Sequence, residues 1–141
     1  MAVTPNRPSK AKAKPRGIEI RDAHFPGRAP VDSYGNGGFR FADMSHRGSI
    51  LCLPSGIYGW SASEMADLTS TAFEQVFREE GIEFLILGTG GNLLPVPQAL
   101  REEFAERSIR IEPMSTGAAA RTFNVLLAEG RAVGAALLAV D

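Results

Sequence analysis

Cysteine and histidine are scarce in this 141-residue chain, and their scarcity excludes several classes of protein. The single cysteine, Cys52, has no second cysteine with which to form an internal disulfide, which favours a reducing compartment. One cysteine and two widely spaced histidines, His24 and His46, are too few for an ordinary zinc site. We therefore expect neither a disulfide-stabilised extracellular domain nor a bound metal.

Long apolar runs are also missing. The longest strongly apolar stretch, residues 132–140, is interrupted by Gly134, and it is far shorter than the about 20 residues that a membrane-spanning helix needs. The first residues of the chain lack the apolar core of about 7–15 residues that a secretory signal contains. We expect no membrane span and no export.

Acidic residues are missing from the first 17 residues of the chain. Residues 1–17 contain no acidic residue but five basic ones, and the whole chain has 15 basic and 16 acidic residues. Residues 18–141 therefore keep 10 basic against 16 acidic residues, a net charge of −6. Because residues 1–17 hold few large apolar side chains, we predict a disordered basic tail there and a single globular domain over 18–141. The acidic body argues against nucleic acid as the main partner.

Apolar alternation in the first half of the chain predicts antiparallel strands. Strands are expected at 18–20, 31–34, 39–41 and 49–53, with a glycine-rich turn at 35–38 and a loop over 44–48. The turn-rich link 54–60 is expected to expose apolar side chains, and its candidate partner-surface residues are Ile57, Tyr58 and Trp60. Ser61 and Glu64 have the spacing of a capping box, so a helix is expected from Ser61, with Gly81 as its C-terminal cap.

The second half alternates between strands and helices. Strands are expected at 82–87, 109–111 and 131–140, and helices at 98–107 and 115–128. Consecutive strand, helix and strand segments imply right-handed crossovers and a small parallel sheet. The predicted fold class is therefore a mixed α+β domain, with N-terminal antiparallel strands followed by parallel βαβαβ units.

No catalytic motif in the chain is complete. The sequence Gly88-Thr89-Gly90-Gly91 follows a strand, but a dinucleotide-binding fingerprint needs glycine at position 93, which is leucine, and no Walker lysine follows. Ser55 lacks the flanking glycines of a hydrolase elbow, and Cys52 lies within an apolar strand. We therefore predict a protein that is not an enzyme and needs no cofactor.

A small polar pocket is the binding site that the residue pattern favours most. Ser115 or Thr116 would cap a helix whose free amide groups can hold an anion. Arg121 and Asn124, three residues apart, share a face of that helix, which is expected to turn toward the Gly88–Gly91 loop. The candidate ligand-binding residues are Gly88, Thr89, Gly90, Thr116, Arg121 and Asn124. The alternative is a structural turn, with Arg121 paired to a carboxylate such as Glu112 or Glu129.

Several segments together resemble a known family. They are the strand-and-turn segment 31–41, the segment 48–54 with Trp60, the strand and loop 84–90, residues 129–133 and, most specifically, residues 114–126. Residues 18–141 resemble a former domain-of-unknown-function family. That family contains bacterial and archaeal single-domain proteins, mitochondrial complex I assembly factor 3 and an adipogenesis-associated cytosolic protein.

The resemblance implies a compact three-layer β/β/α fold of two β-sheets and helices, and it implies no established enzyme activity. For the mitochondrial member it implies assembly of respiratory complex I through protein contacts. We therefore expect a non-enzymatic protein-binding module whose partners are complex I subunits or another assembly factor. It is expected in the cytoplasm, peripherally at the inner face of the membrane. The alternative function is the binding of a small anionic molecule, or an enzyme activity, at the predicted pocket.

Overall fold

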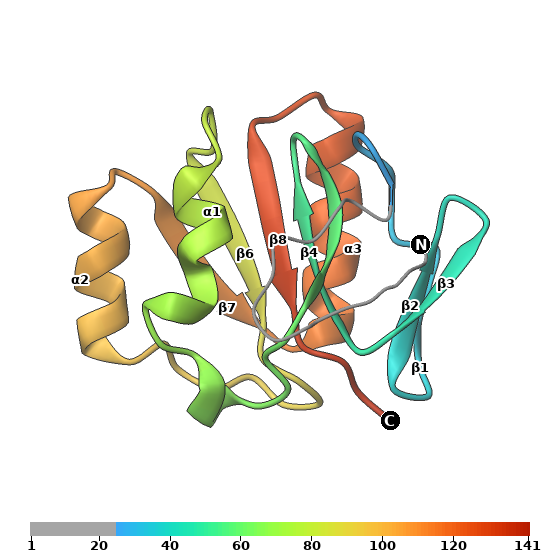
Figure 1. The fold of residues 1–141 in the computed structure, drawn as a ribbon, viewed down its shortest axis with the longest axis horizontal. Helices are drawn as coiled ribbons and strands as arrows, with labels where there is room; N and C mark the ends of the chain where they lie inside the picture. The colour runs from blue at the N-terminus through green and yellow to red at the C-terminus, as the bar shows by residue number, and fades with distance from the viewer. Residues whose placement is uncertain (1–24) are drawn as a thin grey trace, which may run out of the picture.

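The computed structural model describes residues 25–141 (Figure 1). The predictions for the tail 1–17, the strand at 18–20 and His24 lie outside the described residues. The strands are β1 (Ser33–Gly35), β2 (Gly38–Phe41), β3 (Met44–Arg47), β4 (Ser49–Leu53), β5 (Gly56–Trp60), β6 (Phe84–Gly88), β7 (Arg110–Met114) and β8 (Val133–Leu137). The helices are α1 (Glu74–Arg78), α2 (Gln98–Glu106) and α3 (Thr116–Ala128), with 3₁₀ turns η1 (Met65–Asp67) and η2 (Thr71–Phe73) before α1.

The strand pairing confirms the mixed α+β fold. A five-stranded sheet has the order β5-β4-β8-β6-β7, in which β6 pairs in parallel with both β7 and β8. Because β6, α2, β7, α3 and β8 follow one another along the chain, this part is the predicted βαβαβ unit. The strand β4 pairs antiparallel with β5 and β8, and β1, β2 and β3 form a separate antiparallel sheet.

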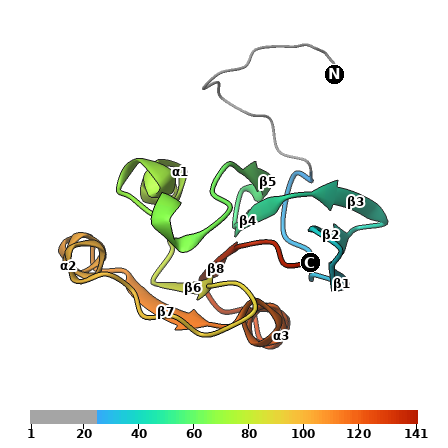
Figure 2. The same cartoon turned by 90° about the horizontal axis from the view of Figure 1, so that it is seen from below.

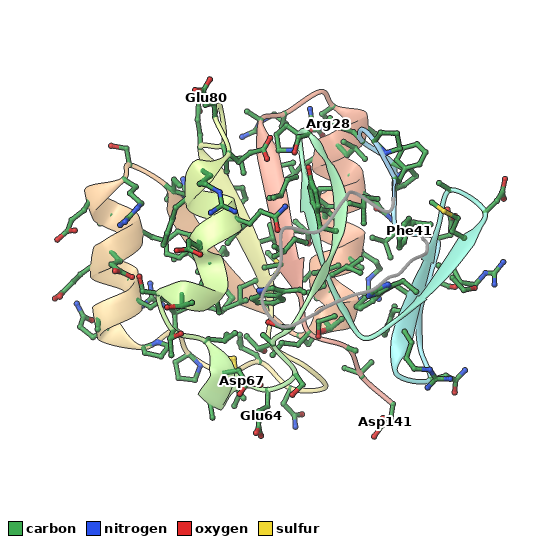
Figure 3. All side chains as sticks on the ribbon, viewed as in Figure 1. Arg28, Phe41, Glu64, Asp67, Glu80 and Asp141 are labelled. Atoms are coloured by element: carbon green, nitrogen blue, oxygen red, sulfur yellow. The ribbon has the colours of Figure 1, made fainter. Side chains whose placement is uncertain are left out.

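Two apolar clusters, one on each face of the five-stranded sheet, hold three layers together. Figure 2 shows α1 and α2 on one side of this sheet and α3 with the small sheet on the other. On one face, Phe104 of α2 packs in a cluster with Leu85 of β6. On the other face, Phe123 of α3 and Phe41 of β2 share a cluster with Ile86, the next residue of β6. Successive residues of a strand point to opposite faces of a sheet, so one strand serves both clusters. Figure 3 shows Phe41 between the small sheet and the five-stranded sheet.

The segment Met44–Arg47, predicted as a loop, is the strand β3. It is joined to β2 through Ala42 and Asp43, whose φ angles of 49° and 62° are in the left-handed region. Two successive residues of positive φ make the tight turn that matches the twist of a hairpin. Neither residue is glycine, the usual sign of such a turn. The polar residues of β3 belong to the solvent-facing side of a strand.

The helix expected from Ser61 is shorter than predicted. The chain makes the 3₁₀ turns η1 and η2 before α1 begins at Glu74. The capping box pairs Glu64 with Asp67, which lie at the lower edge of the molecule in Figure 3. The Asp67 carboxylate accepts hydrogen bonds from the backbone N–H and hydroxyl of Ser63 and from the N–H of Glu64, and these bonds lower the pKa of Asp67.

Candidate functional site

Thr116 joins the glycine-rich loop to the start of α3. Its hydroxyl accepts a hydrogen bond from the Gly90 N–H at 3.0 Å and donates one to the Leu138 carbonyl oxygen at 2.7 Å. Its own N–H donates to the Gly90 carbonyl oxygen at 2.8 Å. Thr116 is completely buried. The structure therefore joins the loop to the start of the helix through direct hydrogen bonds.

Thr89 closes the same loop on itself. Its hydroxyl donates to the Asn92 carbonyl oxygen at 2.5 Å and accepts from the Leu94 N–H at 3.1 Å. The Thr89 N–H donates to the Met114 carbonyl oxygen at 2.8 Å, which attaches the loop to the end of β7. Thr89 is buried. The loop after β6 is thus a hydrogen-bonded turn fixed at the carboxyl ends of two parallel strands.

The space between this loop and α3 is filled at Gly88. A Cβ atom there would lie 3.0 Å from both Leu137 Cδ2 and Thr116 Oγ1, so a larger residue would have to displace these neighbours. Two N–H groups of the first turn of α3 already have partners, because that of Thr116 bonds the loop and that of Ala118 bonds Ser115 Oγ. A helix N-terminus binds anions through free amide groups, and these two are not free.

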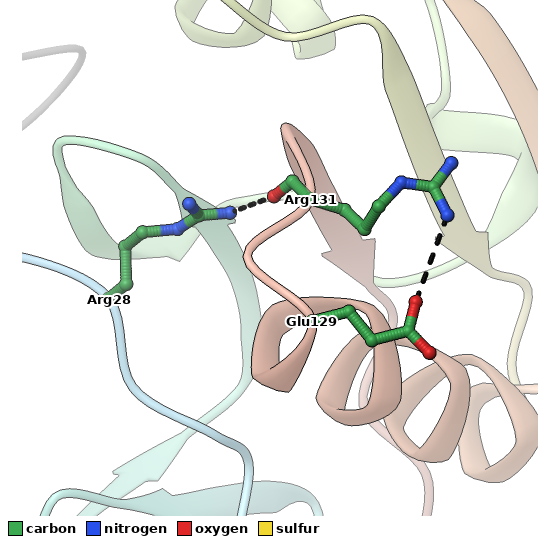
Figure 4. Close-up of polar contacts among 3 residues, drawn as sticks. All are labelled: Arg28, Glu129 and Arg131. Atoms are coloured by element: carbon green, nitrogen blue, oxygen red, sulfur yellow. Dashed lines mark hydrogen bonds and ion pairs between the residues drawn. The ribbon is translucent and has the colours of Figure 1, made fainter.

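Arg121 and Asn124 do not meet the loop through any hydrogen bond. The Asn124 side-chain amide accepts from the Val31 N–H and donates to the Val31 carbonyl oxygen, both at 2.9 Å. Asn124 therefore fastens the segment before β1 to α3. Arg121 is exposed and has no hydrogen-bond or ion-pair partner among residues 25–141. The expected alternative, a pairing of Arg121 with Glu112 or Glu129, is not formed among the described residues. Glu129 pairs with Arg131 at 3.8 Å (Figure 4).

The segment before β1 is also attached at its beginning. Arg28 donates a hydrogen bond to the carbonyl oxygen of Arg131 at 2.7 Å (Figure 4). It donates another to the carbonyl oxygen of Val133 at 3.3 Å. With the bonds between Asn124 and Val31, these contacts lay residues 28–31 along one flank of α3. Asn124 and Arg28 are thus structural residues, and the flank of α3 that they cover is not accessible to a ligand.

The structure corrects the prediction that the link 54–60 exposes apolar side chains. Residues Gly56–Trp60 form β5, paired with β4, and Ile57 and Trp60 are buried. The Trp60 indole N–H donates to the Ala72 carbonyl oxygen at 2.7 Å, and the half-buried Tyr58 shares a hydrogen bond between hydroxyls with Ser55 at 2.6 Å. The expectation of an exposed apolar link was wrong because an edge strand can hold glycine and still bury its large side chains. Ile57 and Trp60 are not available to a partner in this structure.

An open hollow of about 420 Å³ on the small sheet was not predicted. Arg40 of β2 is opposite Ser45 of β3, and Arg47 is opposite Gly38, so the two arginines lie on the same face. The Arg40 guanidinium donates to the Ser45 hydroxyl at 2.6 Å. Neither arginine forms an ion pair with a described acidic residue. Two guanidinium groups and a hydroxyl on one concave face suit a carboxylate or a phosphate.

The sequence contained one sign of this hollow. Ser45 and Arg47 alternate with Met44 and His46, as in a strand with one solvated face. The prediction of a loop over 44–48 hid that alternation, and without the register of β2 and β3 nothing placed Arg47 beside Arg40.

Reactive groups outside these regions are few. Cys52 is buried, and its burial raises the pKa of the thiol to about 12, so the thiol is protonated at neutral pH. Among residues 25–141, no three His, Cys, Asp or Glu side chains gather in a group that could hold a metal ion. None of the helices in this described part of the chain has the length and apolar character needed to cross a membrane.

The fold and sequence match several known proteins. The model of a family described as a protein of unknown function (DUF498/DUF598) matches residues 31–138. An uncharacterised protein of Rhodobacter capsulatus is 39% identical over 119 residues, which cover 84% of this chain and 90% of that protein. NADH dehydrogenase (ubiquinone) 1 alpha subcomplex assembly factor 3 of Mus musculus is 30% identical over 122 residues, 86% of this chain. The match spans 66% of the mouse protein's own length.

A solved structure shares the whole architecture. The crystal structure described as an outer membrane protein from Bartonella henselae superposes with a TM-score of 0.80 at 59% identity. The match covers 84% of this chain and 100% of that one. The expected mixed α+β fold and the expected family relationship are both confirmed.

Proposed function

This chain belongs to the protein family of unknown function DUF498/DUF598, and on that premise we propose that it is a non-enzymatic protein-binding module that assists the assembly of respiratory complex I, the NADH dehydrogenase. The observation that carries the proposal is the 30% identity with the mouse assembly factor over 86% of this chain.

We place this role in the cytoplasm, peripherally at the inner face of the membrane. The partners would be complex I subunits or another assembly factor. The net charge of −6 over residues 18–141 supports a protein partner over nucleic acid, whose phosphates repel an acidic body.

Affinity capture from native membranes tests the proposal. The chain, tagged at its C-terminus and expressed at its native level, is purified from mildly solubilised membranes of its host and from a matched strain that lacks complex I. We expect complex I subunits or an assembly factor in the first sample and their absence from the second. Repeated recovery of the chain alone from both strains would contradict the proposal.

Anion binding is a second candidate function, supported at a different place from the predicted pocket. The filled space at Gly88 weighs against a site between the loop and α3, whereas Arg40 and Arg47 line an open hollow. Thermal-shift titrations with phosphate and citrate separate the two sites. Stabilisation that disappears in Arg40→Ala and Arg47→Ala but persists in Arg121→Ala assigns the anion to the hollow, and the reverse pattern restores the predicted pocket. If neither anion stabilises the protein, this second function is excluded.

A further inference from the structure

The outward side of α3 is poor in charge for a surface helix. Arg121 is the only charged residue in its 13-residue sequence. Phe123 faces the core, whereas Arg121, Val125 and Ala128 are exposed. Surface helices normally expose a stripe of charged and polar residues. A face of small and apolar residues around one arginine instead has the composition of a protein–protein interface, in which charged residues are depleted and arginine is enriched.

The exposed large apolar side chains lie on α3 itself or on segments that contact its first turn. Within residues 25–141 they are Tyr34, Leu93, Leu94 and Val125, with exposed fractions of 44%, 62%, 42% and 57%. Val125 belongs to α3. Tyr34 lies against its first turn, because a Cβ atom on Gly117 would overlap the Tyr34 hydroxyl. The two leucines belong to the loop that is hydrogen-bonded to Thr116. We call Tyr34, Leu93, Leu94, Arg121 and Val125 the α3 surface.

The two leucines are held in position without a partner. The Leu94 N–H donates to the Thr89 hydroxyl, which itself donates to the Asn92 carbonyl oxygen, and the Thr89 N–H is bonded to Met114. Holding a loop in one conformation lowers the entropy that is lost on binding. Leu93 and Leu94 are therefore presented to solvent by an ordered turn, as suits a docking element.

The charge of Arg121 determines which occupant fits this surface. A second copy of the chain fits poorly, because a two-fold pairing of α3 helices that cross at their midpoint brings the two Arg121 side chains together. A membrane also fits poorly, since each basic residue contributes only about 1 kcal/mol at an anionic surface and α3 has one. A carboxylate on another protein meets Arg121 with opposite charge, within an apolar surround where such a pair is strongest.

We propose that the α3 surface binds a partner protein that packs apolar side chains against Val125, Leu93 and Leu94 and places a carboxylate opposite Arg121. This inference rests on the proposed function, for which it names the docking surface. It predicts that the contacts with a complex I subunit or assembly factor are made by this side of the molecule. The face of the five-stranded sheet that α2 covers is left free in the complex.

Site-specific photo-crosslinking in the native host tests the surface. The photoreactive residue benzoyl-phenylalanine replaces Leu93 or Val125, and in the control it replaces Arg101, an exposed residue of α2 on the opposite face of the five-stranded sheet. We expect adducts with a complex I subunit or assembly factor from positions 93 and 125 and none from position 101. Adducts from position 101 alone, adducts between two copies of this chain, or adducts with lipid alone would overturn the proposal.

A charge variant supplies the second arm. We expect Arg121→Glu to lower the adduct yield about tenfold or more, as truncation of an interface hot spot does, and Arg101→Glu to leave it unchanged. Arg121 is exposed and without a partner among residues 25–141, so we expect Arg121→Glu to keep the melting temperature of the unaltered chain. If Arg121→Glu lowers the melting temperature, Arg121→Gln takes its place. Undiminished adducts in both Arg121 variants refute the arginine's role. If affinity capture with the unaltered chain recovers complex I subunits but positions 93 and 125 form no adducts, the proposed function stands and the proposed surface is wrong. If neither experiment recovers complex I subunits or an assembly factor, the proposed function and the proposed surface both fail.

Discussion

Replacing Thr116 by valine measures how much the junction between the loop and α3 contributes to stability. Valine keeps the shape of threonine but removes the hydroxyl that accepts from Gly90 and donates to the Leu138 carbonyl oxygen. Leu138 is only 2% exposed, so we treat its carbonyl as out of reach of water. An unsatisfied buried acceptor costs about 1–3 kcal/mol. The N–H of the half-buried Gly90 can bond water instead and adds little.

We therefore expect Thr116→Val to lower the free energy of unfolding by about 1–3 kcal/mol, which corresponds to a fall in Tm of about 4–12 °C for a domain of this size. Urea unfolding followed by the fluorescence of Trp60, the single tryptophan, gives the midpoint and slope. Thr122→Val is the matched control, because Thr122 lies on the same helix and its hydroxyl has no hydrogen bond to another described residue. Equal midpoints for Thr116→Val and Thr122→Val would refute the reasoning.

Three further predictions concern other residues. Asn124→Ala removes both hydrogen bonds to Val31 and should cost about 1–3 kcal/mol in urea unfolding; a midpoint equal to that of the unaltered chain would show that this attachment is dispensable. Asp67→Ala should lower the urea midpoint at pH 7, and the gap should close as the pH falls below 3.8, the ordinary pKa of the carboxyl group. The hydrogen bonds to the ionised carboxylate stabilise the fold above pH 3.8, and this contribution is lost as the pH falls through the lowered pKa of the folded state. A difference between the two midpoints that stays constant down to pH 3 would contradict this account. The Cys52 thiol should not react with Ellman's reagent in the folded protein at pH 8 and should react fully in urea, because burial holds its pKa near 12; rapid labelling of the folded chain argues against this burial.

The second half of the fold could be predicted because its strands and helices are marked locally. The apolar run that becomes β6, the serine that caps α3 and the glycine after its end have strong local preferences, and tertiary packing agrees with them. Gly130 has a φ of 74°, as expected for a residue that ends a helix. Parallel pairing then followed from the order of these elements alone.

The first half was less predictable because its short strands depend on hairpin register and packing rather than on strong local signals. The glycines of residues 56–60 suggested a loop. These residues instead form the strand β5, which is held by pairing with β4 and by contact with the turns that precede α1. The strand β3 depends on a hairpin turn at Ala42 and Asp43, which has no glycine to mark it. Short strands of this kind are defined by register, which local sequence does not contain.

Binding at the predicted site stays a prediction, but the structure shows how its residues are arranged. Gly88 and Gly90 lie against Thr116, as the sequence suggested. Sequence reasoning did not foresee that the Thr89 hydroxyl would bond the backbone of its own loop, or that the Thr116 hydroxyl would bond the carbonyl oxygen of Leu138, 22 residues further along the chain. Arg121 was singled out as a ligand for an anion within the molecule, whereas its side chain lies outside that junction.

The amount of assembled complex I in cells without this protein tests the central claim most directly. The gene is deleted in its native host, and complex I is quantified on native gels by NADH dehydrogenase activity, with ATP synthase in the same membranes as the reference. The account predicts that assembled complex I falls in the deletion strain while ATP synthase does not, and that expression of the unaltered chain restores it. Unchanged complex I in the deletion strain would contradict the account.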